Sequence, residues 1–385
     1  MSDLLPSSAD ELADALGSAA ARRQPIALIG KNSKRLMAGP LPDGATRMST
    51  THMRKVRQYE PGDLTVSVEA GMPFAELQSL LAQNGQMIAL DPPFAGEATV
   101  GGVVASNTSG PLRRGFGTVR DLIIGLTFAT LEGKLVSSGG MVVKNVAGLD
   151  MGKLMIGSFG TLAAIASVNF RVHARPEEFR TFLFSSPSLQ SILEKRDAIS
   201  GSNLHPLSLD LLSPAAAAQL RRRGFLLVLR AGGSATVLDR YARELNADET
   251  LTGQAEQDCW SSICDFTPGF FRRENGVVLR VSTTVKDLSS LLRLVSGPSI
   301  TRAASGVTYV YLSSWDAVAP FIQAASEKGW TVVVEFAVDG IRRSKQLWYG
   351  PASTTRDNAF DMMKKVKNMF DPGSLLNPSR LYGRI

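Results

Sequence analysis

Three segments in the first half of the sequence combine glycines with small polar residues and lysines. They are IGKNSKRLMAG (29–39), ATVGGVVASNTSGPLRRGFG (98–117) and GGMVVKNVAGLDMGKLMIGSFGTL (139–162). Backbone N–H groups exposed where a strand runs into a turn can form a nest for a pyrophosphate. Asn32 and Ser33 would add donors there, while Lys31 and Lys34 would offset negative charge. Residues 101–110 carry little side-chain bulk, so a flat ring system could lie against them, and the three segments together indicate a site for a large anionic cofactor.

The usual nucleotide-binding motifs do not account for these glycines. The sequence has no G-x-x-x-x-G-K-[ST], which excludes a P-loop. It also has no G-x-G-x-x-G between a strand and a helix, which excludes the Rossmann fingerprint. One glycine-rich segment by itself would fit ordinary surface turns equally well. Three such segments in one half of the chain argue for a shared binding role.

Metal and thiol chemistry have little support in the sequence. The two cysteines, Cys259 and Cys264, form one C-x4-C pair, whereas iron–sulfur clusters and structural zinc generally need four ligands. The three histidines, His52, His173 and His205, lie far apart and show no metal-binding spacing. We therefore expect no metal site in this chain.

Composition and charge bound the class of protein. The chain has 385 residues, 44% hydrophobic and 20% charged, which predicts a globular protein of two or three domains. The sequence contains no run of about 18 apolar residues, so no membrane-spanning helix is predicted. The first residues lack a signal-peptide pattern. We expect a cytoplasmic protein. The net charge of +7 is scattered without a basic stripe interleaved with aromatics, so no nucleic-acid partner is expected, while weak attraction to an acidic partner or anionic lipid stays open.

The glycine-rich segments are set among predicted helices and strands of a first domain. The hydrophobic pattern predicts helices over 9–22 and 73–85 and strands over 25–30, 64–70, 125–133 and 162–172. Asp150 is a good N-cap for the short helix MGKLMI, and Gly157 is a good terminator for it. That would hold the loop KNVAG rigidly, as a binding corner requires. The stretch ARPEE predicts a domain boundary near residue 176.

The second half of the chain has a different texture. From residue 206, strand and helix patterns alternate in two similar halves, which suggests an α+β domain with ferredoxin-like βαβ units. After residue 340 a helix is expected around 355–369, and the closing FDPGSLLNPSRLYGRI contains too many prolines and glycines for a helix. We therefore predict an α+β fold with a binding domain over 1–176, a second α+β domain over 177–340, and a C-terminal helix and extended tail over 341–385.

The order of these motifs resembles a known family. IGKNSK, VSVEAGMPFAELQSLLAQNGQMIALDPP, ATVGGVVASNTSG, RRGFG, KNVAGLD and GSFGTLAAI follow one another as in the FAD-binding (PCMH-type) domain of the vanillyl-alcohol oxidase superfamily. With the ending FDPGSLLNPSRL, the chain is most similar to the FAD-binding subunits of bacterial glycolate oxidases, and the resemblance covers essentially the whole chain.

The resemblance implies a two-part FAD-binding domain, makes residues 177–340 a cap domain and has the segment 341–385 pack back on the first domain. It also assigns cofactor contacts by motif position. The backbone of the first motif would cradle the pyrophosphate, the second would contact the flavin and ribityl chain, and the third would lie along the adenosine half. The tail would return to the isoalloxazine edge. The residues implied are Gly30, Lys31, Asn32, Ser33 and Lys34, then Thr99, Gly101, Gly102, Ser106, Ser109 and Gly110, then Gly157, Gly160 and Ile165, and in the tail Asn377.

Two departures from the family pattern bear on the chemistry. Members that bind FAD covalently often carry a histidine in the pyrophosphate loop. The corresponding residues of this chain, near Asn32, include no histidine, so noncovalent FAD is expected. Catalytic subunits of the 2-hydroxyacid branch carry a late G-H-x-G-D-G-N-type motif, whereas His205 is the only histidine after residue 200 here. The usual base and metal ligands for hydroxyacid oxidation are therefore missing, and no catalytic residue is assigned.

Three functions remain compatible with the sequence. The first, which we favour, is an FAD-binding subunit that pairs with a catalytic FAD-containing glycolate oxidase subunit and passes electrons to a separate iron–sulfur subunit. It would act on glycolate, a small 2-hydroxyacid, and touch a membrane at most peripherally, on its cytoplasmic side. The second is a self-sufficient flavin dehydrogenase that uses Arg113, Arg114 or Arg342 as a carboxylate clamp, with Tyr349 or Lys144 as a possible base. The third is a scaffold with non-catalytic FAD.

Overall fold

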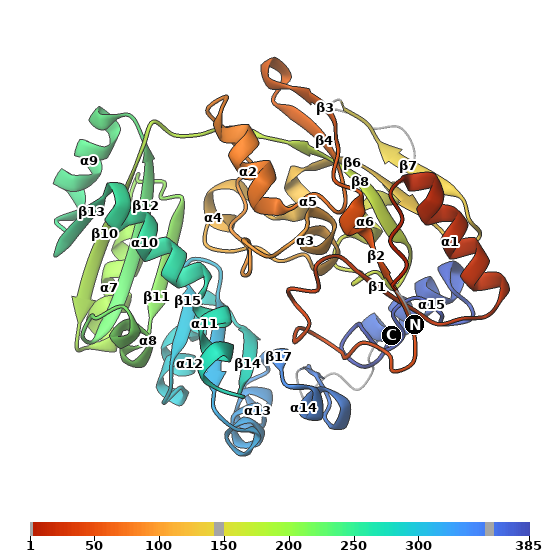
Figure 1. The fold of residues 1–385 in the computed structure, drawn as a ribbon. Coiled ribbons are helices and arrows are strands. Elements are labelled where there is room, and N and C mark those ends of the chain that lie inside the picture. The colour runs from red at the N-terminus through yellow and green to blue at the C-terminus, as the bar shows by residue number, and fades with distance from the viewer. Residues whose placement is uncertain (1–2, 142–149, 351–357) are drawn as a thin grey trace. The chain divides into compact units, whose positions relative to one another are not determined.

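The computed structural model describes residues 3–141, 150–350 and 358–385, which form two compact units (Figure 1). The first unit comprises Met1–Ser109, Gly117–Arg175 and Arg356–Ile385, and the second comprises Gly110–Phe116 and Pro176–Thr355. The main division after Arg175 falls one residue from the boundary expected near 176. Residues 110–116 group with the second unit, and the C-terminal segment groups with the first. The loop KNVAG lies outside the described residues.

A small parallel sheet forms one half of the first unit. Strands β1 (Ile26–Ile29) and β2 (Thr46–Ser49) pair in parallel, and single bridges add Leu4 on one side and Leu376 on the other. Helix α1 (Ala9–Ala21) shares a core with this sheet and begins where the Ser8 side chain accepts the N–H of Glu11. Its apolar residues Leu12 and Leu16 lie in one core with both strands, as their i, i+4 spacing predicts.

An antiparallel five-stranded sheet forms the other half of the first unit, in the order β3-β4-β8-β6-β7. Its strands are β3 (Val56–Glu60), β4 (Thr65–Glu69), β6 (Ile123–Ala129), β7 (Leu135–Gly139) and β8 (Ala164–Arg171). The helices of this half are α2 (Phe74–Ala82), α3 (Val100–Ser106), α5 (Val119–Leu122) and α6 (Gly152–Met155), and β5 (Gln86–Met87) pairs with β9 (His173–Ala174). Apolar residues of β4, β6 and β8 share a core with α2 and α3. The predicted strands and helices of this half are therefore present.

In the third glycine-rich segment, the N-cap of helix α6 lies one residue after the predicted position. The N-cap position of α6 is Met151, yet the Asp150 side chain accepts the N–H of Lys153 at 3.3 Å. Gly157 has a φ of +77°, the left-handed conformation expected of a helix terminator. The segment therefore turns where the sequence indicates.

The second unit contains two βαββαβ modules joined edge to edge into one antiparallel sheet. The sheet order is β13-β10-β12-β11-β15-β16-β14-β17-β18, so each module has the strand arrangement of a ferredoxin-like fold. The first module has β10 (Glu178–Ser186), α7 (Leu189–Ser200), β11 (Ser208–Leu212), α8 (Pro214–Gln219), β12 (Phe225–Gly233), α9 (Ala235–Leu245) and β13 (Glu249–Thr252). The second has β14 (Val277–Ser282), α12 (Leu288–Leu294), β15 (Ser299–Arg302), β16 (Val307–Leu312), α13 (Val318–Glu327) and β17 (Thr331–Ala337). This confirms the expected α+β class with two similar halves.

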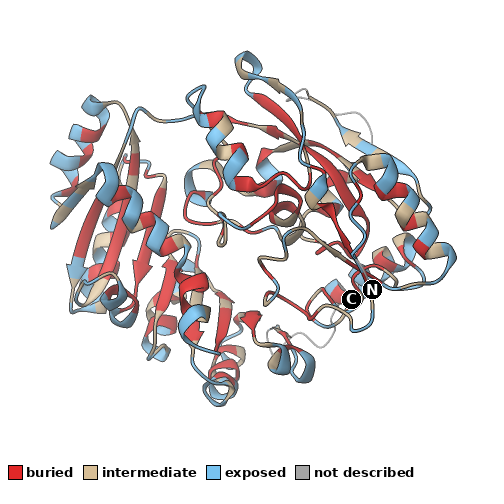
Figure 2. Ribbon diagram, viewed as in Figure 1, coloured by how far each residue is buried: buried red, intermediate tan, exposed pale blue. Residues whose placement is uncertain are grey.

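Other elements join and extend these modules. They are α4 (Arg113–Phe116), α10 (Gly253–Cys264), α11 (Phe266–Arg273), α14 (Asp339–Ser344) and β18 (Trp348–Tyr349). Figure 2 shows that the strands of the large sheet are mostly buried while the helices keep exposed outer faces. The two faces of this sheet differ, because Leu209 and Leu211 of β11 pack with α7 and α9, whereas Asp210 points to the opposite face and pairs there with Arg302.

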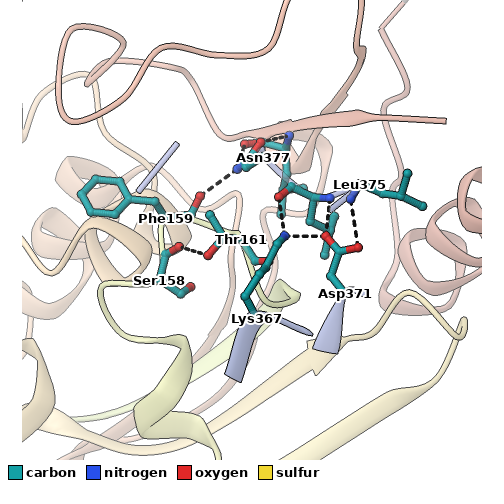
Figure 3. Close-up of polar contacts among 9 residues, drawn as sticks. Ser158, Phe159, Thr161, Lys367, Asp371, Leu375 and Asn377 are labelled. Atoms are coloured by element: carbon teal, nitrogen blue, oxygen red, sulfur yellow. Dashed lines mark hydrogen bonds and ion pairs between the residues drawn. The ribbon is translucent and has the colours of Figure 1, made fainter. Parts of the chain in front are cut away.

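The C-terminal segment returns to the first unit as a helix and a non-helical tail. Helix α15 (Asn358–Phe370) ends before Asp371. The tail that follows pairs with β1 through a hydrogen bond in which Ile26 donates its N–H to the Leu375 carbonyl at 2.8 Å. Figure 3 shows how Lys367 holds this segment: its ammonium pairs with Asp371 and donates to the carbonyls of Thr161 at 2.7 Å and Leu376 at 2.9 Å. The tail is therefore fixed by buried polar contacts.

None of the described helices is both long and apolar enough to cross a membrane.

Candidate cofactor-binding site

One pocket in the first unit gathers most of the residues expected to contact the cofactor. It lies where the loop after β1, helix α3, the 159–165 segment and the C-terminal tail meet. The expected residues that line it are Gly30, Lys31, Asn32, Ser33, Lys34, Thr99, Gly101, Gly102, Ser106, Gly160, Ile165 and Asn377. Residues separated by more than three hundred positions thus share one cavity.

Three expected residues do not line this pocket. Ser109 lies just beyond α3, and Gly110 begins the short stretch that groups with the second unit. Gly157 supports the pocket indirectly, since its N–H donates to the Val104 carbonyl at 3.1 Å and its left-handed φ closes the turn before Phe159. Contacts with a cofactor stay a proposal for these three residues and for the residues that line the pocket alike.

The loop after β1 presents backbone donors. Asn32 has a φ of +56°, a left-handed conformation that curls the chain. Within the described chain, no residue accepts a hydrogen bond from the backbone N–H groups of Lys31, Asn32, Ser33 or Lys34. Consecutive unpaired N–H groups on a curled loop are the geometry of an anion nest.

The glycines of the pocket serve two different purposes. A side chain at Gly30 would overlap the Thr99 hydroxyl, and one at Gly101 would lie 2.8 Å from the Cβ of Ala70, so these two glycines let protein segments approach each other. A Cβ at Gly102 would meet only the Thr99 hydroxyl, at 3.1 Å. Gly102 lies within α3 and lines the pocket, so its missing side chain leaves room inside the cavity.

The charged residues that line the pocket are all cations. Among the described lining residues these are Lys31, Lys34 and Arg380, and none of the others is an aspartate or glutamate. The Lys34 ammonium is buried and has no hydrogen-bond partner in the described chain. Burial lowers the pKa of Lys34 to about 8, because the charged form loses its hydration. A pocket with this charge pattern suits an anionic ligand.

Arg380 is a pocket residue that the sequence analysis missed. Its guanidinium donates to the carbonyls of Met37 and Gly39, and to the Lys34 carbonyl at 3.0 Å. It also lies 5.7 Å from the centre of the Phe159 ring. Because it engages the loop's carbonyls, Arg380 fixes the orientation of the peptide units whose N–H groups line the pocket. Along the sequence Arg380 is marked only by its place at the end of NPSR in the tail. Its role is not visible there, because the loop that it holds is more than three hundred residues away.

Asn377 ties three segments together at the pocket wall. Its side-chain oxygen accepts the N–H of Leu28 at 2.7 Å, and its amide donates to the carbonyls of Leu28 at 3.1 Å and Phe159 at 2.7 Å. Both amide hydrogens are therefore used within the protein. The side chain positions β1, the tail and the 159–165 segment rather than offering a free donor to a ligand.

The remaining wall of the pocket is mostly apolar, and these residues too were missed by motif reasoning. They are Leu28, Ile29, Leu41, Ala70, Ala105, Phe159 and Ala163, with Thr50 as a polar member. An apolar wall with a few polar groups is typical of a cofactor site. No local motif marks these positions, because ordinary core residues have the same types.

Comparison with known proteins identifies the first part of the chain. Residues 3–139 match the sequence family described as FAD binding domain. This part is an FAD-binding domain. The match spans the loop after β1 and helix α3, which both contribute residues to the pocket lining.

Two curated relatives of this FAD-binding protein match nearly its whole length, and a third matches about half of it. The glycolate oxidase subunit GlcE of Escherichia coli K12 is 29% identical over 97% of this chain and 97% of its own. The glycolate oxidase subunit GlcD of Bacillus subtilis 168 is 21% identical over 99% of this chain and 88% of its own. A mitochondrial D-lactate dehydrogenase of Arabidopsis thaliana is 28% identical over 54% of this chain and 36% of its own. The chain is an FAD-dependent oxidoreductase related to enzymes that act on CH–OH donors.

Solved structures show that the fold is shared more widely. The 4-ethylphenol oxidase of Gulosibacter chungangensis superposes with a TM-score of 0.74 at 13% identity, covering 98% of this chain and 88% of its own. An alkyldihydroxyacetonephosphate synthase superposes with a TM-score of 0.70 at 16% identity, covering 97% of this chain and 76% of its own. At these identities the likeness shows the fold alone.

The pocket residues fit FAD. The buried and unpartnered Lys34 ammonium and the N–H groups of residues 31–34 suit a pyrophosphate. The space beside Gly102 and the apolar wall suit a ring system. The described lining includes no histidine or cysteine, the side chains that commonly form a covalent link to flavin. Noncovalent binding accordingly stays our prediction.

Proposed function

We propose that this chain is the FAD-binding subunit of a multi-subunit glycolate oxidase (glycolate dehydrogenase), which oxidises glycolate to glyoxylate. The observation that carries the proposal is that a pocket whose charged lining residues are all cations lies in a chain that matches subunit GlcE over 97% of its length. The match with GlcD, over 99% of this chain, supports the same assignment.

The reaction needs an electron acceptor and a base. When bound, FAD supplies the acceptor for a hydride from the carbon that bears the hydroxyl. Glycolate loses that hydride and its hydroxyl proton, and a carbonyl forms. In this chain the loop after β1 would hold the pyrophosphate, while Arg380 and Asn377 would keep that loop and the pocket wall in place. We assign no base: Lys144 lies outside the described residues, and Tyr349 is a half-buried phenol whose pKa burial raises.

The second unit supports a dependence on partners. On the sheet face that bears Asp210, Arg230 pairs with Glu256 at 2.7 Å and Arg280 pairs with Glu335 at 2.9 Å. Arg302 pairs likewise with Asp210. An arginine already neutralised by a carboxylate is a poor clamp for the carboxylate of a substrate, since that interaction would have to be given up.

The arginines considered as carboxylate clamps for a self-sufficient dehydrogenase are also poorly suited to that role. Arg342 is nearly buried and pairs with Asp339, while Arg113 and Arg114 are exposed on a short helix. The described residues also contain no group of three or more histidine, cysteine or acidic side chains able to hold a metal ion. These features favour a subunit whose substrate chemistry is completed by a partner.

We therefore propose two partners. One is the catalytic FAD-containing glycolate oxidase subunit, and the other is an iron–sulfur subunit that takes up the electrons, because Cys259 and Cys264 are too few to ligate a cluster here. We place the complex in the cytoplasm, with at most peripheral contact with the membrane through the other subunits.

Anaerobic addition of glycolate to the purified chain tests the proposal. The FAD-loaded chain by itself should show slow or no bleaching of the flavin absorbance, whereas the reconstituted complex should be reduced rapidly. Rapid reduction in the isolated chain would instead establish a self-sufficient dehydrogenase. A complex in which only the partner's flavin is reduced, and which keeps full activity when this chain's pocket is blocked, would establish a scaffold with non-catalytic FAD.

A further inference from the structure

Lys34 is the buried charge in the pocket that the protein itself does not satisfy. Its side chain is 8% exposed, and the ammonium has no hydrogen-bond partner in the described chain. Taking an ammonium out of water without a partner is strongly unfavourable. A fold keeps such a group where a ligand provides the missing counter-charge.

We propose that the Lys34 ammonium is the side-chain counter-charge for the pyrophosphate of FAD, and that the cofactor therefore binds only together with a proton on this amine. The inference rests on FAD binding by this chain, which is part of the proposed function. It adds a proton linkage that backbone donors cannot provide, since N–H groups do not titrate.

The surroundings of Lys34 point to the ligand as the partner. The other charged groups that line the pocket are Lys31 on the same loop and Arg380 from the tail, and both are positive. Helix α3 and the 159–165 segment contribute no charged side chain to the lining. The Lys34 carbonyl is held by Arg380, which fixes the backbone from which the ammonium extends.

The linkage has a definite sign. Burial holds the pKa of Lys34 at about 8 in the protein without ligand, against 10.5 for an ordinary lysine. A nearby pyrophosphate would favour the charged form and raise that pKa again. Below pH 8 the amine already carries its proton, so the affinity for FAD should be flat. Above pH 8 binding must include proton uptake, so the affinity should fall by up to about tenfold per pH unit.

The same charge should destabilise the protein without ligand. Because the pKa of Lys34 is lower in the folded chain than in the unfolded one, the unfolded chain binds more protons between pH 8 and 10.5. The free energy of unfolding should therefore rise across that window, and the cost of the buried ammonium is fully present at neutral pH. A variant without the charge should lose FAD affinity and yet leave the apoprotein at least as stable.

The experiment measures FAD binding to the full-length apoprotein by quenching of flavin fluorescence from pH 6.5 to 9.5. We expect the wild type to weaken above pH 8, and Lys34→Met to bind about ten- to a hundredfold more weakly at pH 7 with no pH dependence. Arg35→Met is the matched control: this neighbouring cation is exposed and does not line the pocket, so the variant should keep the wild-type profile. Calorimetry in two buffers should find proton uptake by the wild type at pH 9 and none at pH 7.

Other ligands and stability readouts separate this role from a structural one. Lys34→Met should weaken ADP as it weakens FAD, while binding of riboflavin, which has no phosphate, should be unaffected. An equal loss for riboflavin would place the lysine at the ring system and overturn the proposal. So would a Lys34→Met apoprotein with a lowered melting temperature and wild-type FAD affinity, or a wild type that takes up no proton at pH 9. A wild-type chain that fails to bind FAD at pH 7 would instead contradict the proposed function.

Discussion

Asn377 pairs through its side chain with both backbone groups of Leu28, although the two residues lie at opposite ends of the chain. Together with the bond to the Phe159 carbonyl, this buried amide joins β1, the 159–165 segment and the tail around the pocket. The candidate cofactor pocket thus includes the C-terminal tail in its wall.

Removing this amide should open the pocket. Asn377→Ala would leave three backbone groups of Leu28 and Phe159, one buried and two part-buried, without this partner, at up to about 1–3 kcal/mol for each unsatisfied group. We expect a lowered midpoint in urea and loss of FAD during gel filtration. Asn368→Ala, at an exposed position of α15, is the control and should change neither. An Asn377→Ala protein with full flavin content would show that the tail does not shape the site.

Arg380 should be required for its geometry as well as its charge. Arg380→Lys keeps the charge but cannot reach the carbonyls of Lys34, Met37 and Gly39 together, because an ammonium lacks the planar fork. We expect both Arg380→Lys and Arg380→Met to weaken FAD binding at least tenfold, measured by fluorescence quenching. If Arg380→Lys binds FAD as the wild type does, the charge suffices and the clamp is dispensable.

The two neighbouring glycines of α3 should respond differently to a leucine. The Cβ of Gly102→Leu meets only the Thr99 hydroxyl and the position lines the pocket, so we expect the apoprotein to stay folded while FAD binding is lost. Gly101→Leu would collide with Ala70 and should lower the melting temperature of the protein. Flavin content and thermal unfolding of the two purified variants check this contrast. A Gly102→Leu protein that keeps its FAD would make Gly102 an ordinary helix residue.

The buried Lys367–Asp371 pair should couple strongly. Lys367→Met leaves the Asp371 carboxylate, which also accepts the N–H groups of Leu375 and Leu376, without its counter-ion. Breaking a buried pair from one side typically costs about 3–5 kcal/mol. Lys364→Met, on the exposed side of the same helix, should cost little. A double-mutant cycle with Asp371→Leu should return a coupling of at least about 1 kcal/mol, and additive effects would rule out an energetic link.

FAD should be bound without a covalent link. The described pocket lining offers no histidine or cysteine to form one. Acid precipitation of the holoprotein should therefore release all of the yellow colour into the supernatant. Flavin absorbance retained in the washed pellet would contradict this prediction.

Much of the fold could be predicted from local patterns. The i, i+4 spacing of Leu12 and Leu16 indicated α1, and the alternation around Val66 and Val68 indicated β4. The strand–helix alternation after residue 206 indicated two α+β halves, because each short element carries its own period. The loop residues Gly30 to Lys34 were located by composition, since a glycine and two lysines directly after a strand are typical of an anion-binding loop.

Only the tertiary structure decided how segments that are distant in the sequence contact one another. The distinction between Gly101 and Gly102 depends on Ala70, which lies in a different element. The clamp of Arg380 on the loop after β1 and the isolation of the Lys34 ammonium are invisible along the chain, since both depend on which groups folding brings near and which it keeps away. Residue types and local periods are properties of the sequence by itself, whereas hydrogen-bond partners and burial exist only once the chain has closed on itself.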